Sequence, residues 1–209
     1  VGVAWSIYAT SLATFHWLEF FATALYKWRD LSYDSFLLNH STAYTAAVVA
    51  GAVEFWVESL VLNFGPPVPC IAAGAVVVLA GQTVRFLAMA TAREHFAHRI
   101  MIDKADDHRL VTTGIYAVLR HPAYAGWFWW SVGTQLLLAN PVCIVAYAYA
   151  SWSFFADRIP FEEATLVAFY PAEYAAYARR TWLGIPGIPT TSSTSANTKG
   201  PFDDDDDDD

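Results

Sequence analysis

The sequence has 209 residues, of which 56% are hydrophobic, 16% aromatic and 15% charged. Soluble domains carry nearer a quarter charged residues, so this composition favours a membrane protein. The formal net charge is −8, but seven aspartates end the chain and leave the rest at −1. That near-neutral remainder has no basic face of the kind that nucleic-acid binding requires.

Three apolar stretches in the first half of the chain are each long enough to cross a bilayer. They are residues 1–28, 43–62 and 70–91, and an uncharged, Pro-rich loop at 63–69 precedes the third. Cys70 lies in the third stretch and Cys143 in a later apolar segment, without metal-ligand or disulfide spacing. We expect both to be small buried hydrophobic residues.

The second half contains a fourth apolar and aromatic region, residues 123–156, which is broken at Asn140-Pro141. Each half is short for a full crossing, which predicts a tight helical hairpin. Residues 158–180 are charged and rich in aromatics, and predict a separate amphipathic helix. The tail is Ser/Thr-rich and ends in poly-Asp, so we expect it to be disordered.

The distribution of Lys and Arg predicts the orientation in the membrane. Basic residues follow the first and third stretches, whereas the loop at 63–69 has none: Lys27, Arg29, Arg93, Arg99, Lys104 and Arg109. By the positive-inside bias, the loops after the first and third stretches are cytosolic. The polar stretch 108–126 and the 158–180 helix then share the cytosolic face.

Four ionisable residues interrupt the apolar stretches and are costly in lipid. Glu19 and Arg85 lie toward the predicted cytosolic ends, where we expect helix–helix hydrogen bonding or an end-of-helix position. Glu54 and Glu58 lie within the second stretch, where a polar cavity lining and helix–helix hydrogen bonding are equally plausible. All four are expected to face the protein interior or to snorkel.

Residues 108–126, HRLVTTGIYAVLRHPAYAG, combine polar chemistry with chain breakers. In HRLVTTGxY, backbone donors and the His108 imidazole could hold a carboxylate or a ribose, but a capping segment with Thr113 as N-cap explains it as well. In RHPxYxG, Pro122 suits the first turn of a helix whose free N–H groups favour an anion. An interfacial aromatic belt explains the tryptophans that follow, but not the Arg-His pair.

A third cluster, Arg158-x-x-x-Glu162-Glu163, places Arg158 and Glu162 one helical turn apart. One reading is an i,i+4 ion pair worth a few tenths of a kcal/mol. The other is that Arg158 binds a substrate carboxylate bidentately, while Glu162 holds a cationic or hydroxyl group of a cofactor.

Together these segments resemble the isoprenylcysteine carboxyl methyltransferase family. The resemblance is carried by HRLVTTGIYAVLRHPAYAGWFWWSVGTQLLLANPVC, FFADRIPFEEATL and EYAAYARRTWLGIPGI, with FLLNHSTAY and FAHRI upstream. It runs from about residue 15 to residue 188. The RHPxYxG element alone also occurs in other membrane methyltransferases and sterol reductases, but its combination with GTQxxLxNPxC and DRxxxEE is specific.

The resemblance implies S-adenosylmethionine-dependent methylation of the C-terminal α-carboxylate of prenylated cysteine in CaaX-processed, small-GTPase-like proteins. It also implies a multi-pass endoplasmic reticulum protein whose active site faces the cytosol, with no metal and no nucleic acid. By motif position, Arg158 would be the catalytic, substrate-binding residue. The implied S-adenosylmethionine-binding residues are His108, Arg109, Leu110, Val111, Tyr116, His121, Pro122, Ala123, Tyr124 and Glu162.

The expected fold is therefore all-α and integral to the membrane, with about five transmembrane helices, the last two a tight hairpin, and a cytosolic C-terminal amphipathic helix. Residues 1–91 would hold three transmembrane helices, 92–189 the catalytic region and 190–209 the tail. Three alternatives stay open: a phospholipid N-methyltransferase, which needs no arginine for its amine acceptor, a sterol-reductase-like NADPH enzyme, and an inactive membrane scaffold. Trp127 and the hairpin that follows it, with the first two helices, are candidates for a lipid path.

Overall fold

The computed structural model describes residues 1–38, 41–98, 100 and 109–189. His108 and the tail from residue 190, both named in the sequence predictions, lie outside the described residues. Within these ranges the protein is helical, with one isolated bridge between Leu119 and Trp182 in place of a sheet.

The described residues form six α-helices and four 3-10 segments. The helices are α1 (Gly2–Tyr26), α2 (Thr42–Leu60), α3 (Val68–Ala92), α4 (Pro122–Leu138), α5 (Pro141–Phe169) and α6 (Pro171–Arg180). The 3-10 segments are η1 (Trp28–Asp30), η2 (Tyr33–Phe36), η3 (Arg93–His95) and η4 (Gly114–Ala117). This all-helical architecture agrees with the fold class predicted from the sequence.

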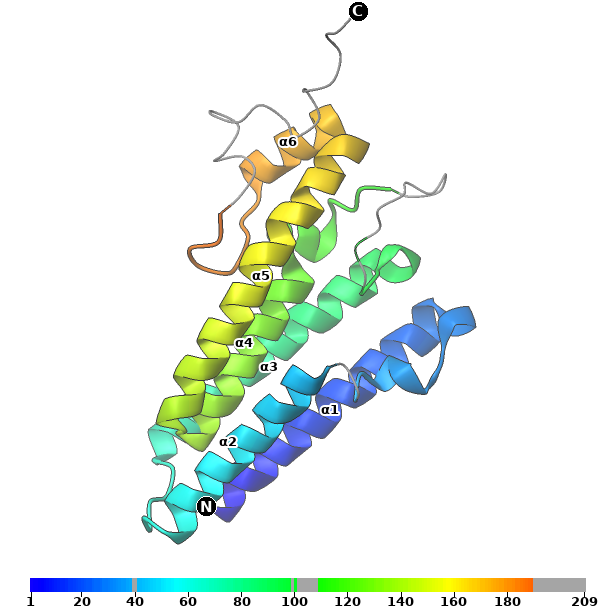
Figure 1. Cartoon of the computed structure of the whole chain (residues 1–209). Coiled ribbons are helices and arrows are strands. Elements are labelled where there is room, and N and C mark those ends of the chain that lie inside the picture. Colours follow the sequence, from blue (N-terminus) through cyan, green and yellow to red (C-terminus); the bar gives the residue numbers. More distant parts are fainter. Residues whose placement is uncertain (39–40, 99, 101–108, 190–209) are drawn as a thin grey trace, which may run out of the picture.

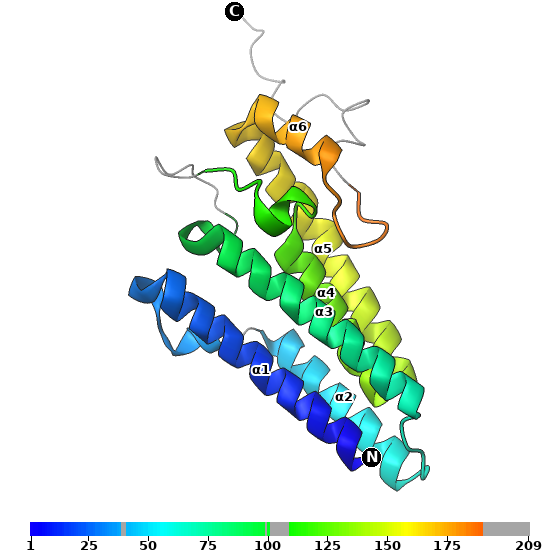
Figure 2. The ribbon, with the colours of Figure 1, turned by 180° about the vertical axis from the view of Figure 1, so that it is seen from behind.

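The five long helices run roughly along one direction, with α1 and α2 on one side of the molecule and α4 and α5 on the other (Figure 1). The view from behind shows α3 packed along α4 (Figure 2). The C-terminal ends of α1, α3 and α5 lie toward the same end of the bundle, where α6 also lies. By length and hydropathy, the described residues include one helix able to cross a membrane, Val68–His95, so the count of about five spans stays a prediction.

Glycine allows the backbones of α3 and α4 to approach closely. A Cβ added to Gly81 would lie 2.5 Å from the Trp130 nitrogen, and one added to Gly126 would lie 2.6 Å from the Arg85 nitrogen. Neither position has room for a side chain, so the small residues set the distance between the two helices. The start of α4 is thereby held against the Arg85 region of α3.

The predicted break at Asn140-Pro141 is confirmed. Ala139 ends α4 in the left-handed conformation with φ 59°, and Asn140 donates from Nδ2 to the Gly51 carbonyl at 2.8 Å. The Glu54 carboxylate of α2 accepts from the first amides of α5, including that of Cys143 at 2.7 Å. Glu54 therefore hydrogen-bonds between helices, as a distant cap for the free N–H groups of α5.

The prediction of a separate helix over residues 158–180 is wrong. Helix α5 continues without interruption from Pro141 past Arg158 to Phe169, and α6 begins at Pro171. Pro160 lies inside α5, where it removes one backbone donor without ending the helix. Pro171 occupies the first turn of α6, a position that suits its fixed φ, so the chain reorients there instead.

The segment after α6 returns beside α5 (orange in Figure 1) and packs against the hairpin. Leu183, Ile185 and Ile188 join the buried cluster that includes Phe128 and Phe155. The bridge between Leu119 and Trp182 ties the same segment to the loop that precedes α4. The chain before α4 and the chain after α6 are thus held together at one end of the hairpin.

Candidate active site

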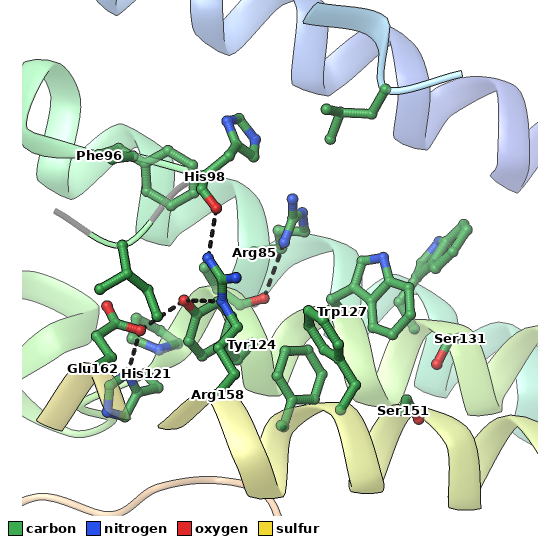
Figure 3. Close-up of a pocket in the computed structure, with 18 of the residues that line it drawn as sticks. Arg85, Phe96, His98, His121, Tyr124, Trp127, Ser131, Ser151, Arg158 and Glu162 are labelled. Atoms are coloured by element: carbon green, nitrogen blue, oxygen red, sulfur yellow. Dashed lines mark hydrogen bonds and ion pairs between the residues drawn. The ribbon is translucent and has the colours of Figure 1, made fainter. Parts of the chain in front are cut away.

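A cavity of about 780 Å³ lies between the α1–α2 pair and the α4–α5 hairpin. Small-molecule sites commonly have volumes of about 300–1,000 Å³. At one end the lining is polar and comes from the loop before α4, the first turn of α4 and α5, with Arg158, Tyr124 and Glu162 close together (Figure 3). Farther along, Trp127, Ser131 and Ser151 line a part with mostly apolar walls.

Every described residue that the sequence predictions placed in the site lines this one cavity. These residues are Arg109, Leu110, Val111, Tyr116, His121, Pro122, Ala123, Tyr124, Arg158 and Glu162. They come from the loop before α4, the first turn of α4 and the second half of α5. Residues as far apart in the sequence as Arg109 and Glu162 therefore line the same cavity, because the α4–α5 hairpin folds back on itself.

Tyr124 connects the two charged residues of α5. Its hydroxyl donates to Glu162 Oε2 at 2.6 Å and accepts from Arg158 Nε at 2.8 Å. Arg158 and Glu162 thus meet through the hydroxyl rather than as the simple i,i+4 ion pair considered from the sequence. Both hydrogen bonds involve a charged partner, which makes them stronger than bonds between neutral groups.

A second hydrogen bond orients the Arg158 guanidinium. Its Nη2 donates to the backbone carbonyl of His98 at 2.6 Å. The guanidinium carbon lies 5.5 Å from the centre of the Tyr124 ring and 5.7 Å from that of Phe154. Since a guanidinium has five N–H groups, these two bonds leave three donors for a ligand in the cavity.

His121, the N-cap residue of α4, packs against Tyr124. The two rings are nearly parallel, with centroids 5.6 Å apart and an interplanar angle of 8°. The His121 Nε2 lies 3.4 Å from Glu163 Oε1, and Nδ1 lies 3.9 Å from Glu162 Oε2. The buried imidazole therefore lies between two adjacent carboxylates and packs against the Tyr124 ring.

Arg120 and Glu163 form a buried ion pair beside the cavity. Arg120 donates from Nε to Glu163 Oε1 at 2.6 Å and from Nη1 to the Thr181 carbonyl at 2.9 Å. Glu163 lies beyond the predicted apolar hairpin. Burial raises the pKa of its carboxyl, but the neighbouring His121 imidazole and the hydrogen bond from Arg120 lower it more, so the pKa is held at about 2. Glu163 is therefore an anion at neutral pH and fixes the loop before α4 onto α5.

The tyrosines around this loop stay neutral. Burial and the nearby Glu162 charge raise the pKa of Tyr116 above its usual value. Burial likewise raises the pKa of Tyr177, whose hydroxyl donates to the Tyr116 carbonyl at 2.8 Å. These residues offer hydroxyls and aromatic faces to a ligand rather than negative charge.

Glu19 and Arg85 pair with each other, which confirms the expected helix–helix hydrogen bonding. Arg85 donates from Nε and Nη2 to the two Glu19 oxygens, the second at 3.1 Å, and from Nη1 to the Ala123 carbonyl at 3.2 Å. His98 Nε2 lies 3.0 Å from Glu19 Oε2. Arg85 also lines the cavity, so this charged cluster adjoins the site.

Sequence reasoning assigned no role to His98 or Glu163. Glu163 is adjacent to Glu162, and consecutive residues on a helix point about 100° apart, so a pair of carboxylates predicts one inward and one sideways contact. The His98 ring contacts Glu19 and its backbone carbonyl contacts Arg158. The spacing of residues in FAHRI does not predict either contact. Within the described ranges, no group of three or more His, Cys, Asp or Glu side chains could hold a metal ion.

The fold and the site define a helical protein whose elongated cavity has an arginine–tyrosine–glutamate chain at one end and apolar walls beyond it. The sequence of residues 73–168 matches the model of the isoprenylcysteine carboxyl methyltransferase (ICMT) family. The chain is 44% identical over 182 residues to the protein-S-isoprenylcysteine O-methyltransferase of Xenopus laevis and 44% identical over 185 residues to that of Dictyostelium discoideum. It belongs to the isoprenylcysteine carboxyl methyltransferase family.

These matches include 87% of this chain, 63% of the Xenopus protein and 77% of the Dictyostelium protein. The chain thus spans a little under two thirds of the length of the Xenopus relative. The fold is similar to the solved structure of the eukaryotic intramembrane Ras methyltransferase ICMT, with a TM-score of 0.81 and 41% sequence identity. That similarity covers 88% of this chain and 67% of the other.

Proposed function

We propose that this protein methylates the C-terminal carboxylate of a prenylated cysteine, using S-adenosylmethionine, to give a methyl ester. Family membership and the names of the relatives support this reaction. The observation that carries it is the cavity end where Arg158 and Glu162 are joined by Tyr124. Arg158 is a cation that suits the acceptor carboxylate. Glu162, which shares the Tyr124 hydroxyl with it, is an anion that suits the positively charged methyl donor.

The residues present fit S-adenosylmethionine, which supplies a methyl group from a sulfonium cation. Glu162 offers a cavity-facing carboxylate whose side chain is 27% exposed, and which suits an ammonium or a ribose hydroxyl. The Tyr116 ring, which also lines the cavity, suits a cation through its ring electrons. The remaining proposed contacts that line the cavity are Arg109, Leu110, Val111, His121, Pro122 and Ala123. His108, outside the described residues, is proposed as a contact from the sequence motif.

The apolar part of the cavity suits the prenyl group. Small side chains line it from both sides, Ala46 and Ala50 from α2 and Ala146 and Ala150 from α5, with Trp127 on α4. Such walls leave room for a branched hydrocarbon and gain free energy by removing it from water. We infer that the substrate lies along α2 and α5, with its carboxylate at the Arg158 end.

Arg158 carries the chemical role in this proposal. A cysteine carboxylate is ionised at neutral pH, so the reaction needs orientation rather than a general base. The three remaining guanidinium donors can hold one carboxylate oxygen and leave the other free to face the methyl donor. Exclusion of water from this end would strengthen the attraction, although removing water from the carboxylate also costs free energy.

We further propose that the protein crosses the endoplasmic reticulum membrane several times, about five in this chain, and that the site faces the cytosol. The Arg and Lys pattern and the lipid nature of a prenylated CaaX protein support this placement. The substrates would be CaaX-processed proteins of the small-GTPase type, presented with the prenyl group in the bilayer.

The test is transfer of labelled methyl from S-adenosylmethionine to N-acetyl-farnesylcysteine by membranes that contain the chain. Arg158→Ala should abolish transfer, whereas the exposed Arg29→Ala is the matched control and should leave it unchanged. Transfer to a phospholipid amine, unaffected by Arg158→Ala, would contradict the proposal and favour the N-methyltransferase alternative. An inactive chain that also fails to bind S-adenosylmethionine would refute the methyltransferase function altogether.

A further inference from the structure

The single carboxylate of helix α1, Glu19, lies close to the proposed site. Glu19 is 0% exposed and accepts hydrogen bonds from two guanidinium nitrogens of Arg85. It also faces His98 Nε2 at 3.0 Å, from a residue 79 positions later in the chain. A pair with Arg85 alone would satisfy the charge, so the contact with His98 suggests a second role.

His98 connects this carboxylate to Arg158, because its ring contacts Glu19 and its backbone carbonyl contacts Arg158. The ring meets Glu19, while the backbone carbonyl of the same residue accepts from Arg158 Nη2 at 2.6 Å. Figure 3 shows His98 above Arg158 with this hydrogen bond drawn. The second anchor of the guanidinium, the Tyr124 hydroxyl, comes from a different element, α4. Two anchors from separate elements determine the plane of a rigid, planar guanidinium.

We propose that Glu19 is a positioning residue for Arg158: it holds the His98 ring, and the His98 carbonyl then holds the guanidinium in the orientation that receives the acceptor carboxylate. This inference rests on the proposed function, because it concerns how the same site recognises its acceptor. Glu19 itself does not line the cavity, whereas Arg158 does. It therefore acts through another residue.

The pairing of Arg85 supports the same role. Arg85 and Arg158 both line the cavity, so an unpaired Arg85 would offer a second cation to the acceptor carboxylate. Glu19 neutralises Arg85, and a third hydrogen bond ties Arg85 to the Ala123 carbonyl next to Tyr124. Because Glu19 neutralises Arg85, Arg158 is the cation that remains for the acceptor carboxylate.

The experiment compares Glu19→Gln in two backgrounds, with Arg158 intact and with Arg158→Lys. In the Arg158 background, Glu19→Gln should lower kcat/KM for N-acetyl-farnesylcysteine by about tenfold or more, since small misplacement of a reacting group costs up to about a hundredfold. A lysine ammonium has no plane to orient. With Arg158→Lys, adding Glu19→Gln should therefore change kcat/KM by less than about twofold, whereas general damage to the fold would lower it equally in both backgrounds.

A second variant covers the case in which Glu19→Gln fails to fold. His98→Ala removes the ring but keeps the carbonyl and leaves the Glu19–Arg85 pair intact. The activity-independent measurement is the affinity for N-acetyl-farnesylcysteine relative to its methyl ester, in detergent and without S-adenosylmethionine. The wild-type chain should bind the carboxylate more tightly than the methyl ester. Glu19→Gln and His98→Ala should each reduce this preference about tenfold. The double variant should reduce it no further than the single variant with the larger effect.

The outcomes separate this inference from the function on which it depends. If the wild-type chain methylates the acceptor and Arg158→Ala abolishes transfer, but His98→Ala and Glu19→Gln keep the carboxylate preference, the positioning role is wrong and the function stands. Equal losses in the two Arg158 backgrounds also overturn it, because they show a structural effect. A wild-type chain with neither transfer nor carboxylate preference overturns the proposed function and this inference together.

Discussion

Replacing Tyr124 by phenylalanine removes one oxygen and leaves the ring that lies parallel to His121. The change deletes the hydrogen bond to Glu162 Oε2 at 2.6 Å and that from Arg158 Nε at 2.8 Å. Hydrogen bonds to charged groups contribute about 1.5–3 kcal/mol. Because Glu162 and Arg158 are only half-buried and water can replace the hydroxyl, the lower end applies, about 1.5 kcal/mol.

A loss of about 1.5 kcal/mol in the transition state corresponds to roughly a tenfold lower kcat/KM. The assay is methyl transfer to N-acetyl-farnesylcysteine, with each substrate varied in turn. Since the hydroxyl touches both charged residues, kcat/KM should fall for the acceptor and for S-adenosylmethionine alike. Tyr33→Phe is the matched control, because Tyr33 is 67% exposed in η2, and it should behave as wild type.

Two results would refute this reasoning. A kcat/KM within twofold of wild type for both substrates would mean that the hydroxyl does not organise the site. A tenfold loss of kcat/KM together with a lower thermal midpoint would mean that the Tyr124 hydroxyl stabilises the fold instead of organising the site. The thermal midpoint of the purified variant in detergent therefore has to be measured beside its kinetics.

The remaining predictions concern stability. Gly126→Ala should lower the thermal midpoint in detergent by several degrees, because its Cβ would lie 2.6 Å from the Arg85 nitrogen and push α3 from α4; Gly2→Ala, with nothing within 4 Å, is the control, and equal midpoints would contradict the close packing. The pKa of Glu163 falls from 4.5 to about 2 on folding, so its contribution is complete above about pH 4.5 and is lost as the pH falls toward 2. Glu163→Gln should lower the midpoint at pH 7 and flatten the wild-type decline between pH 4.5 and 2, and an unchanged decline would contradict the assignment.

Several features of the fold follow from local sequence. The apolar stretches at 1–28, 43–62 and 70–91 became α1, α2 and α3 within a few residues, since a long and mostly apolar run that ends in polar or breaker residues has few other solutions. The break at Asn140-Pro141 was equally local. The end of the last long helix was not, because Arg158 and its neighbours are compatible both with a new helix and with the continuation of α5.

The candidate site was predictable in its membership but not in its connections. The residues of HRLVTTGxY and RHPxYxG are close in sequence, and a hairpin brings Arg158 and Glu162 to them, so each described member lines one cavity. That Tyr124 joins Arg158 to Glu162 depends on the register of α4 against α5. Side-chain spacing on α5 alone favours a direct ion pair, which the intervening hydroxyl replaces.

The sequence by itself determined the helical class, the family resemblance and the motif residues that line the cavity, because each rests on composition or on motifs of neighbouring residues. The tertiary structure alone decided which charges meet. Glu19 reaches His98 and Arg85 across 79 and 66 positions, and Arg120 reaches Glu163 across 43. Such pairs form because burial excludes water and leaves each charge dependent on whichever partner the packing of the helices brings near, and packing is a property of the whole chain.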